Sequence, residues 1–483
     1  MINRIKTLPL FLFLLTKMVV TQGQGKSFDI FLADSSMSNA SVSLCIINSE
    51  TGERIMEHNS QRSLTPASIL KLVTTAAALE ILGPEYTFRT QIGYTGSLNK
   101  LNGRLSGNLV IRGGGDPALG SDYFTEHYKN FINNWISEII KSGIKEIKGR
   151  IICDDSRYDY QPVPGKWQWE DSGNYYGAGA YGLSVFDNTC RIHFTTSAPG
   201  SVPEITRIEP AQYIYRFTNR LTSLGNSDKG YIFSAPYSNS GWLTGTIPVN
   251  TDDFILKGSI ADPPMLLAQI IHAGLDSAGI IITGEPSTAR LEGQSSGTGF
   301  IGITETLSPP LKEIIRILNY ESVNLYAEHL LKEMGLVMSD EGSTGSGTKA
   351  IEGFFKESGI DTGGFFIKDG SGLSRTNAVT SAGMVSLLRY MKEDSPHYTE
   401  FFNSLPEAGK TGTLTSYFKD PVFDGRMKAK SGSMERVRCY AGYLVSMAGH
   451  ELIFCIMINN FSGSSAEVIK SIENVLREAI LSN

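Results

Sequence analysis

The chain has 483 residues and a mass of 52.7 kDa, enough for two or three domains with large cores. Hydrophobic residues make up 41% and charged residues 19%, which excludes a disordered, collagen-like or coiled-coil protein. The formal net charge is −6 and the basic residues are scattered, so we predict no nucleic-acid partner.

Residues 1–25 have the pattern of a secretory signal peptide. Arg4 and Lys6 precede a short apolar stretch, and small and polar residues follow Lys17. The stretch is too short to span a bilayer well, and no later stretch approaches the length of a membrane span. We therefore predict an exported protein, periplasmic or extracellular, with no firm membrane anchor; an uncleaved N-terminal anchor is the alternative.

The next segment predicts a β-hairpin and then a long helix. An alternating apolar pattern at residues 42–46 turns at residues 49–52 and returns. The helix is predicted over residues 68–82, because Pro66 stands just before it and Gly83 ends it.

Ser68 and Lys71 form a Ser-x-x-Lys pair at the start of this helix. A spacing of three places both side chains on one helical face. The free backbone amides of the first turn can stabilise negative charge on oxygen, and the apolar run after Lys71 can lower the lysine pKa. The pair is a candidate nucleophile and base, although this spacing alone occurs often by chance.

Residues 91–299 differ in character, with short strands, Gly-rich turns and few helices, and we predict that they form an inserted domain. Apolar spacing predicts one helix over about 124–139 and another over about 264–279. The segment of about 190–260 is rich in Ser, Thr and Asn and is a candidate for a nested lobe.

Helices return after residue 300. Ser322 and Asn324 lie between two amphipathic helical stretches within residues 311–334. At such a junction the hydroxyl could relay a proton and the amide could hold a substrate carbonyl; the alternative is a simple helix cap.

Near the C-terminus, Lys430, Ser431, Gly432 and Ser433 are predicted to start a strand that leads into a final hairpin. A cation and two hydroxyls on an edge strand suit a substrate carboxylate, and Gly432 lets the backbone come close. A rival Lys-Thr-Gly-Thr sequence begins at Lys410 but has no long strand after it, so we favour Lys430. The first and last hairpins together predict one sheet built from both chain ends.

The order Ser-x-x-Lys, Ser-x-Asn, Lys-Ser/Thr-Gly is the set used by penicillin-binding proteins and class A β-lactamases. The chain resembles the D-Ala-D-Ala carboxypeptidase/endopeptidase family, the class C low-molecular-mass penicillin-binding proteins with a large insertion. Further stretches at residues 107–117, 324–328 and 369–375 resemble its signatures. Two departures, Val323 in the second motif and Ser431 for Thr in the third, leave the reactive groups in place.

The resemblance implies an α+β fold: a β-lactamase/transpeptidase-like domain of residues 26–90 and 300–483, with a five-stranded antiparallel sheet flanked by helices and interrupted by the insertion. It also implies roles. Ser68 would be acylated, Lys71 would be the base, Ser322 would protonate the leaving D-Ala, and Asn324 would hold the peptide. The backbone amides of Ser68 and Ser433 would form the oxyanion hole.

The same resemblance implies a substrate cleft. Lys430, Ser431 and Ser433 would bind the terminal carboxylate. The cleft would be bordered by Ser371, Leu373 and Arg375, and Asp154 or Asp155 from the insertion would meet the amine of a diaminopimelate side chain.

The predicted partners are peptidoglycan stem peptides, with β-lactam antibiotics as covalent inhibitors. No Cys-x-x-Cys or His-Glu-x-x-His motif occurs, so we predict no metal site, and the resemblance implies no cofactor. Two other hypotheses stay open at this point: a catalytically slow scaffold that binds peptidoglycan, and a β-lactamase or esterase on the same fold.

Overall fold

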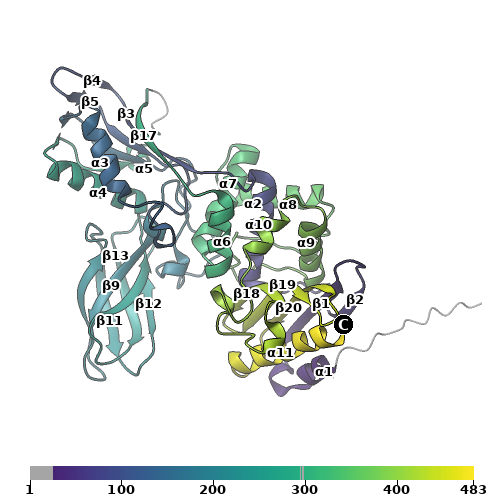
Figure 1. The fold of residues 1–483 in the computed structure, drawn as a ribbon. Coiled ribbons are helices and arrows are strands. Elements are labelled where there is room, and N and C mark those ends of the chain that lie inside the picture. Colours follow the sequence, from purple (N-terminus) through teal and green to yellow (C-terminus); the bar gives the residue numbers. More distant parts are fainter. Residues whose placement is uncertain (1–25, 294, 296–298) are drawn as a thin grey trace, which may run out of the picture.

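The computed structural model describes residues 26–293, 295 and 299–483 (Figure 1). The predicted signal peptide lies outside the described residues. Within these ranges, no helix combines the length and the apolar character that a membrane span requires.

A five-stranded antiparallel sheet joins the two ends of the chain, in the order β18-β19-β20-β1-β2. Its strands are β1 (Ser41–Asn48), β2 (Arg54–His58), β18 (Met427–Met434), β19 (Val437–Val445) and β20 (Glu451–Asn459). Both predicted hairpins are present, and β1 pairs with β20 over its full length. The predicted sheet is confirmed.

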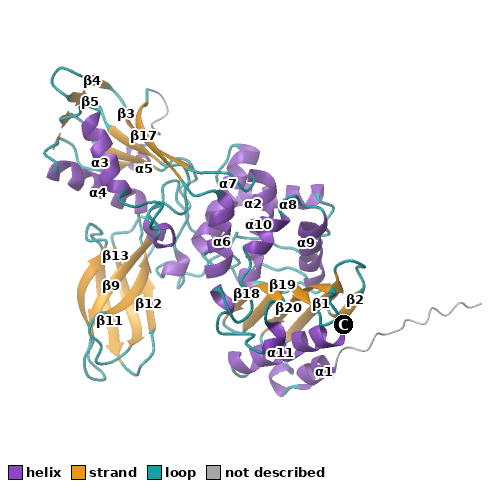
Figure 2. Cartoon of the chain, viewed as in Figure 1, coloured by secondary structure: helices purple, strands orange, loops and turns teal. Residues whose placement is uncertain are grey.

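Helices cover both faces of this sheet (Figure 2). Alternate residues of a strand point to opposite faces: Leu44 and Ile46 pack into a core with α1 (Lys26–Ala33) and α11 (Ser465–Ser482), whereas Cys45 and Ile47 belong to the core on the other side. The helices of that second layer are α2 (Leu70–Leu82), α6 (Leu311–Glu321), α7 (Asn324–Ser339), α8 (Thr344–Glu357), α9 (Ser381–Glu393) and α10 (Tyr398–Asn403).

The inserted part leaves and rejoins this body through two neighbouring strands, β3 (Arg89–Tyr94) and β17 (Ile301–Leu307), which pair antiparallel. This pairing places β3 and β17 in the same sheet, so it favours an insertion that is slightly longer at both ends than the predicted residues 91–299; the exact boundaries stay a prediction. One sheet has the order β16-β8-β6-β3-β17 and another the order β15-β7-β5-β4. Their further strands are β4 (Ser97–Asn99), β5 (Arg104–Ser106), β6 (Leu109–Arg112), β7 (Glu146–Ile147), β8 (Ile151–Asp154), β15 (Ile281–Ile282) and β16 (Ser287–Thr288). The helices here are α3 (Phe131–Lys141), α4 (Pro263–Ser277) and α5 (Ala289–Glu292).

Two three-stranded sheets form a lobe of their own within the insertion (Figure 1), with the orders β10-β9-β14 and β11-β13-β12. The strands are β9 (Thr189–Thr195), β10 (Glu204–Glu209), β11 (Arg216–Ser223), β12 (Lys229–Phe233), β13 (Ser240–Ile247) and β14 (Phe254–Ser259). We call residues 189–259 the nested lobe. Its inward side chains, among them Ile192, Ile232 and Leu243, form a separate hydrophobic core.

Buried polar contacts fix the insertion against α7. The Lys332 ammonium donates to Asp159 over 2.6 Å, and the buried Glu333 carboxylate accepts from Arg157 over 3.1 Å and from Tyr158 over 2.7 Å. Buried charges that find such partners hold two surfaces in one relative position, because separating them would leave a charge unpaired. The segment after Asp159 is thereby placed at the mouth of the cleft described below.

Candidate active site

Ser68 lies in a short 3₁₀ helix, η2 (Ala67–Ile69), that runs directly into α2. The predicted single helix therefore begins as a tighter turn, but Ser68 and Lys71 still share one face. Lys71 Nζ lies 3.1 Å from Ser68 Oγ. This is hydrogen-bond distance, so the lysine can exchange a proton directly with the hydroxyl.

Lys71 is fully buried and has three oxygen neighbours. Besides Ser68, its Nζ contacts Asn324 Oδ1 at 2.6 Å and the Ser371 carbonyl at 2.7 Å. Burial lowers the lysine pKa to about 7, although the charges of Asp369 and Glu328 act in the opposite direction. Near neutral pH a substantial fraction of Lys71 is therefore the free amine that a general base requires.

Two buried carboxylates lie behind Lys71. Glu328 accepts the backbone amides of Gly370 and Ser371, and burial together with the charge of Asp369 raises its pKa to about 8. Asp369 accepts four hydrogen bonds: from the Gly372 and Ser374 amides, Trp167 and Asn377. These contacts fix the 369–374 segment, whose Ser371 carbonyl points at Lys71.

The second motif occupies the junction between α6 and α7, as predicted. Ser322 ends α6 in a left-handed conformation with φ 59°, and Asn324 opens α7. Asn324 uses both ends of its amide: Oδ1 accepts from Lys71, and Nδ2 donates to the Tyr176 carbonyl over 2.8 Å. The asparagine therefore connects the base to the insertion.

The third motif lies within the edge strand β18. Lys430 is fully buried, and its Nζ donates over 2.9 Å to Ser322 Oγ and over 2.9 Å to the Ser431 carbonyl. Burial and the neighbouring charge of Lys71 both lower its pKa well below the ordinary value. A Cβ on Gly432 would lie 2.5 Å from the Pro66 carbonyl oxygen, so only glycine lets β18 come this close to η2.

One detail of this motif differs from the prediction. Lys430 does not begin the strand that continues through residue 439; β18 ends at Met434, and a turn at Arg436, with φ 55°, leads into β19. Two adjacent polar residues, Glu435 and Arg436, interrupt the apolar alternation between Met434 and Val437, and this break was the sequence signal for the two-residue connection.

The rival Lys410 is exposed and forms ion pairs with Glu407 and Asp424, both at 2.6–2.7 Å. Its motif is not isolated from the site, however. Thr413 from the same loop shares a 2.8 Å hydrogen bond with Ser431. The structure thus brings Lys430 into contact with Ser322, whereas the rival sequence contacts β18 through Thr413.

A cleft of about 840 Å³ opens over these residues. Ser68, Ser322 and Asn324 line it together with the predicted Leu373, Arg375 and Ser433. Ser371 and Ser431 are not among the lining residues and act from behind it, through the contacts to Lys71 and Thr413.

Asp154 and Asp155 are placed elsewhere, so the prediction that one of them meets a substrate amine in this cleft is wrong. Neither residue lines the cleft. Asp154 ends β8 and accepts from Ser156 over 2.6 Å, and Asp155 accepts the Arg290 amide. Both are buried inside the insertion, because β8 is an inner strand of its sheet.

The acidic group that does reach the cleft from the insertion is Asp171, which the sequence analysis did not select. It lines the cleft beside Gln168 and Tyr176. Burial and the neighbouring Glu170 raise its pKa. The sequence signal for this segment was its group of aromatic residues at positions 167–176, because aromatic side chains often pack where two parts of a protein meet.

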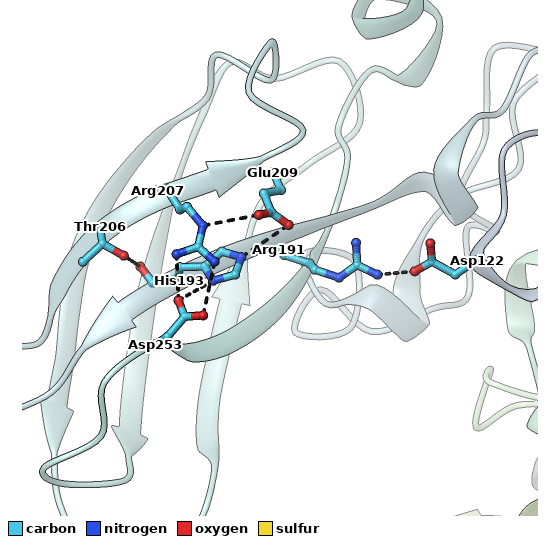
Figure 3. Close-up of polar contacts among 7 residues, drawn as sticks. All are labelled: Asp122, Arg191, His193, Thr206, Arg207, Glu209 and Asp253. Carbon is cyan, nitrogen blue, oxygen red and sulfur yellow. Dashed lines mark hydrogen bonds and ion pairs between the residues drawn. The ribbon is translucent and has the colours of Figure 1, made fainter. Parts of the chain in front are cut away.

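Residues of the nested lobe also line the cleft, and a network of charged side chains lies next to them (Figure 3). Buried His193 lies between Asp253, at 2.7 Å, and Glu209, at 3.4 Å, and Arg207 pairs with both carboxylates. Glu209 also lines the cleft. The charged network therefore connects β9 and β10 to the start of β14, next to the cleft.

The site contains a serine nucleophile, a desolvated lysine and a second serine–lysine pair, and the fold has a five-stranded antiparallel sheet. Together these features define a class of protein: serine enzymes that transfer acyl groups on a transpeptidase-like fold. The chain belongs to the D-Ala-D-Ala carboxypeptidase 3 (S13) family, whose model matches residues 24–479. It is a serine-type D-Ala-D-Ala carboxypeptidase of the penicillin-binding class, and the family, fold and enzyme class predicted from the sequence are confirmed.

Similar proteins span nearly the same length. The D-alanyl-D-alanine carboxypeptidase of Actinomadura sp. (strain R39) is 26% identical over 450 residues, which cover 91% of this chain and 81% of the relative. Penicillin binding protein 4 of Haemophilus influenzae has a similar structure, with a TM-score of 0.80, 22% identity and coverage of 94% of this chain and 98% of the other. The same Haemophilus protein complexed with a β-lactam has a TM-score of 0.74 at 22% identity, and the match covers 92% of this chain and 97% of the other.

Proposed function

We propose that the carboxypeptidase acts on peptidoglycan stem peptides through an ester on Ser68. Ser68 Oγ attacks the carbonyl carbon of the penultimate D-Ala while its proton passes to Lys71 Nζ. The observation that carries this proposal is the 3.1 Å contact between these two atoms at a lysine whose pKa is lowered to about 7.

Collapse of the tetrahedral intermediate breaks the peptide bond, and the leaving D-Ala nitrogen takes a proton from Ser322 Oγ. Lys430, 2.9 Å from that oxygen, returns a proton to it. Water then attacks the ester and gives a proton through Ser322 Oγ to Lys430, and Ser68 Oγ takes back the proton held by Lys71 as the shortened peptide leaves. The backbone amides of Ser68 and Ser433, both in the cleft lining, are the proposed oxyanion hole.

The remaining groups hold the substrate. Ser433, beside the Lys430 cation, suits the terminal carboxylate, and Leu373 and Arg375 border the peptide. In place of Asp154 and Asp155, Asp171 is the proposed partner for a cationic side chain of the stem peptide, because its carboxylate belongs to a residue that lines the cleft. Export to the periplasm or the cell exterior belongs to the same proposal, since the substrate lies there.

β-Lactams are the proposed covalent inhibitors, because a Haemophilus protein of the same fold has been solved with one bound. The intact Ser68, Lys71, Ser322, Asn324 and Lys430 set favours an enzyme over a slow scaffold.

The test is release of D-Ala from a short acylated peptide that ends in D-Ala-D-Ala. We expect release by the wild type, none from the same peptide ending in L-Ala, and none by Ser68→Ala. Binding of the peptide without release would support the scaffold. Rapid turnover of benzylpenicillin without peptide hydrolysis would support a β-lactamase.

A further inference from the structure

Three aromatic rings form a cluster beside the cleft: half-buried Phe233 and exposed Trp242 from the nested lobe, and exposed Trp169 from the segment before it. Phe233 on β12 and Trp242 on β13 are cross-strand partners, with ring centroids 5.3 Å apart and planes within 7°. Trp169, from the segment before η4 (Tyr175–Gly177), lies 6.1 Å from Trp242 and 6.4 Å from Phe233. Trp169 is 56% exposed and Trp242 is 39% exposed.

Single exposed hydrophobic residues are ordinary, but a contiguous exposed apolar patch is typical of a binding site. A cross-strand pair such as Phe233 and Trp242 would stabilise the sheet by itself. Trp169 is not explained in this way, because it comes from a different segment and more than half of its surface stays in water. We call these three residues the aromatic platform.

The platform lies on a sheet face that also presents hydrogen-bonding groups. Side chains alternate along the strands of this sheet, and Trp242 shares its outward face with its neighbours Thr218 on β11 and Thr244 on β13. In the next row Thr244 lies between Arg220 and Tyr231. Flat rings for stacking, with hydroxyls and guanidinium groups around them, are suited to a ligand with apolar faces and polar edges.

The platform is continuous with the catalytic cleft. Tyr231 lies on the outward face of β12, two residues before Phe233, and also lines the cleft. Gln168 and Glu170, the neighbours of Trp169 in the chain, line the cleft as well. A ligand that extends out of the cleft past Tyr231 therefore reaches the rings directly.

We propose that the aromatic platform binds the carbohydrate rings of a peptidoglycan glycan strand. A pyranose ring has apolar C–H faces and hydroxyl edges, which match the stacked rings and the polar groups around them. This inference rests on the proposed function, because the stem peptide cleaved at Ser68 is attached to such a strand. The platform thus selects stem peptides that are still joined to glycan.

The experiment uses the full chain and two probes: glycan strands from which the stem peptides have been removed, and the short D-Ala-D-Ala peptide without sugar. We expect isothermal titration calorimetry to show binding of the glycan strands, and Trp169→Ala and Trp242→Ala each to weaken it about tenfold or more. Hydrolysis of the short peptide is expected to stay unchanged in both variants. Phe366→Ala is the matched control, because Phe366 is 53% exposed and lies outside the insertion, in an isolated bridge with Ala378 between α8 and α9.

Absence of glycan binding by the wild type, or equal binding by the platform variants, would overturn the inference. A change in self-association on Trp242→Ala with no loss of glycan binding would also overturn it, in favour of contact between copies of the chain. Failure of the proposed function looks different: the wild type would then release no D-Ala from the short peptide, whatever its glycan binding.

Discussion

Lys430 Nζ donates a 2.9 Å hydrogen bond to Ser322 Oγ, which joins the edge strand β18 to the α6–α7 junction. The contact links two motifs that are far apart in the sequence. It also distinguishes the buried Lys430 from the exposed Lys410, whose partners are Glu407 and Asp424.

We predict that Lys430→Met lowers the rate of acylation by about 10²- to 10⁴-fold, because it removes the group that returns a proton to Ser322. Lys410→Met, the matched change in the rival motif, is expected to leave the rate within about threefold of wild type, since it removes only surface ion pairs. The rates are measured with a chromogenic β-lactam under single-turnover conditions. A larger loss in Lys410→Met than in Lys430→Met would reverse our assignment of the third motif.

The pH dependence of acylation follows from Lys71. Burial lowers its pKa to about 7, and only the unprotonated amine can accept the Ser68 proton. The rate is therefore expected to rise with pH, about tenfold per unit below the pKa, and to level off above about 7. A rate that stays constant between about pH 5 and about pH 8 would exclude Lys71 as the titrating base.

Asn324→Asp tests the contact between the second motif and this lysine. The substitution keeps an acceptor 2.6 Å from Lys71 Nζ but adds negative charge and removes the donor to the Tyr176 carbonyl. A nearby carboxylate favours the protonated lysine, so the pH profile is expected to move upward by about one to three units. Asn324→Ala is the control: it should lower the rate without moving the profile upward.

Trp167→Phe tests how the insertion is held at the site. The Trp167 Nε1 donates over 2.8 Å to the fully buried Asp369. Loss of a donor to a buried carboxylate is expected to lower the free energy of unfolding by about 1–3 kcal/mol, measured by urea denaturation. Trp169→Phe, on the exposed ring two residues later, should change it by less than about 0.5 kcal/mol. Equal effects would show that the contact to Asp369 contributes little.

Much of the fold could be predicted because the signals were local. The alternation in β1 and β2, the stop of α2 at Gly83 and the two amphipathic faces around Ser322 each follow from a few neighbouring residues. The three motifs themselves were visible for the same reason. Their assembly followed from the two terminal hairpins, which required one sheet.

The contacts that complete the site could not be predicted from the sequence. Asn324 Nδ2 donates to the backbone carbonyl of Tyr176. Every residue has such a carbonyl, so the amino-acid type at position 176 does not reveal this contact. Asp154 and Asp155 carry the right chemistry but end an inner strand, whereas Asp171 lies on the segment that Trp167 ties to Asp369. Which carboxylate reaches the cleft was decided by long-range packing of the insertion on α7.

The most direct test of the account is the intact mass of the protein after incubation with benzylpenicillin. We predict one stable adduct on the wild type, located by peptide mapping to Ser68, and none on Ser68→Ala. An adduct on a different residue, or an unmodified wild-type protein with the drug intact, would contradict the assignment of Ser68 as the acylated nucleophile.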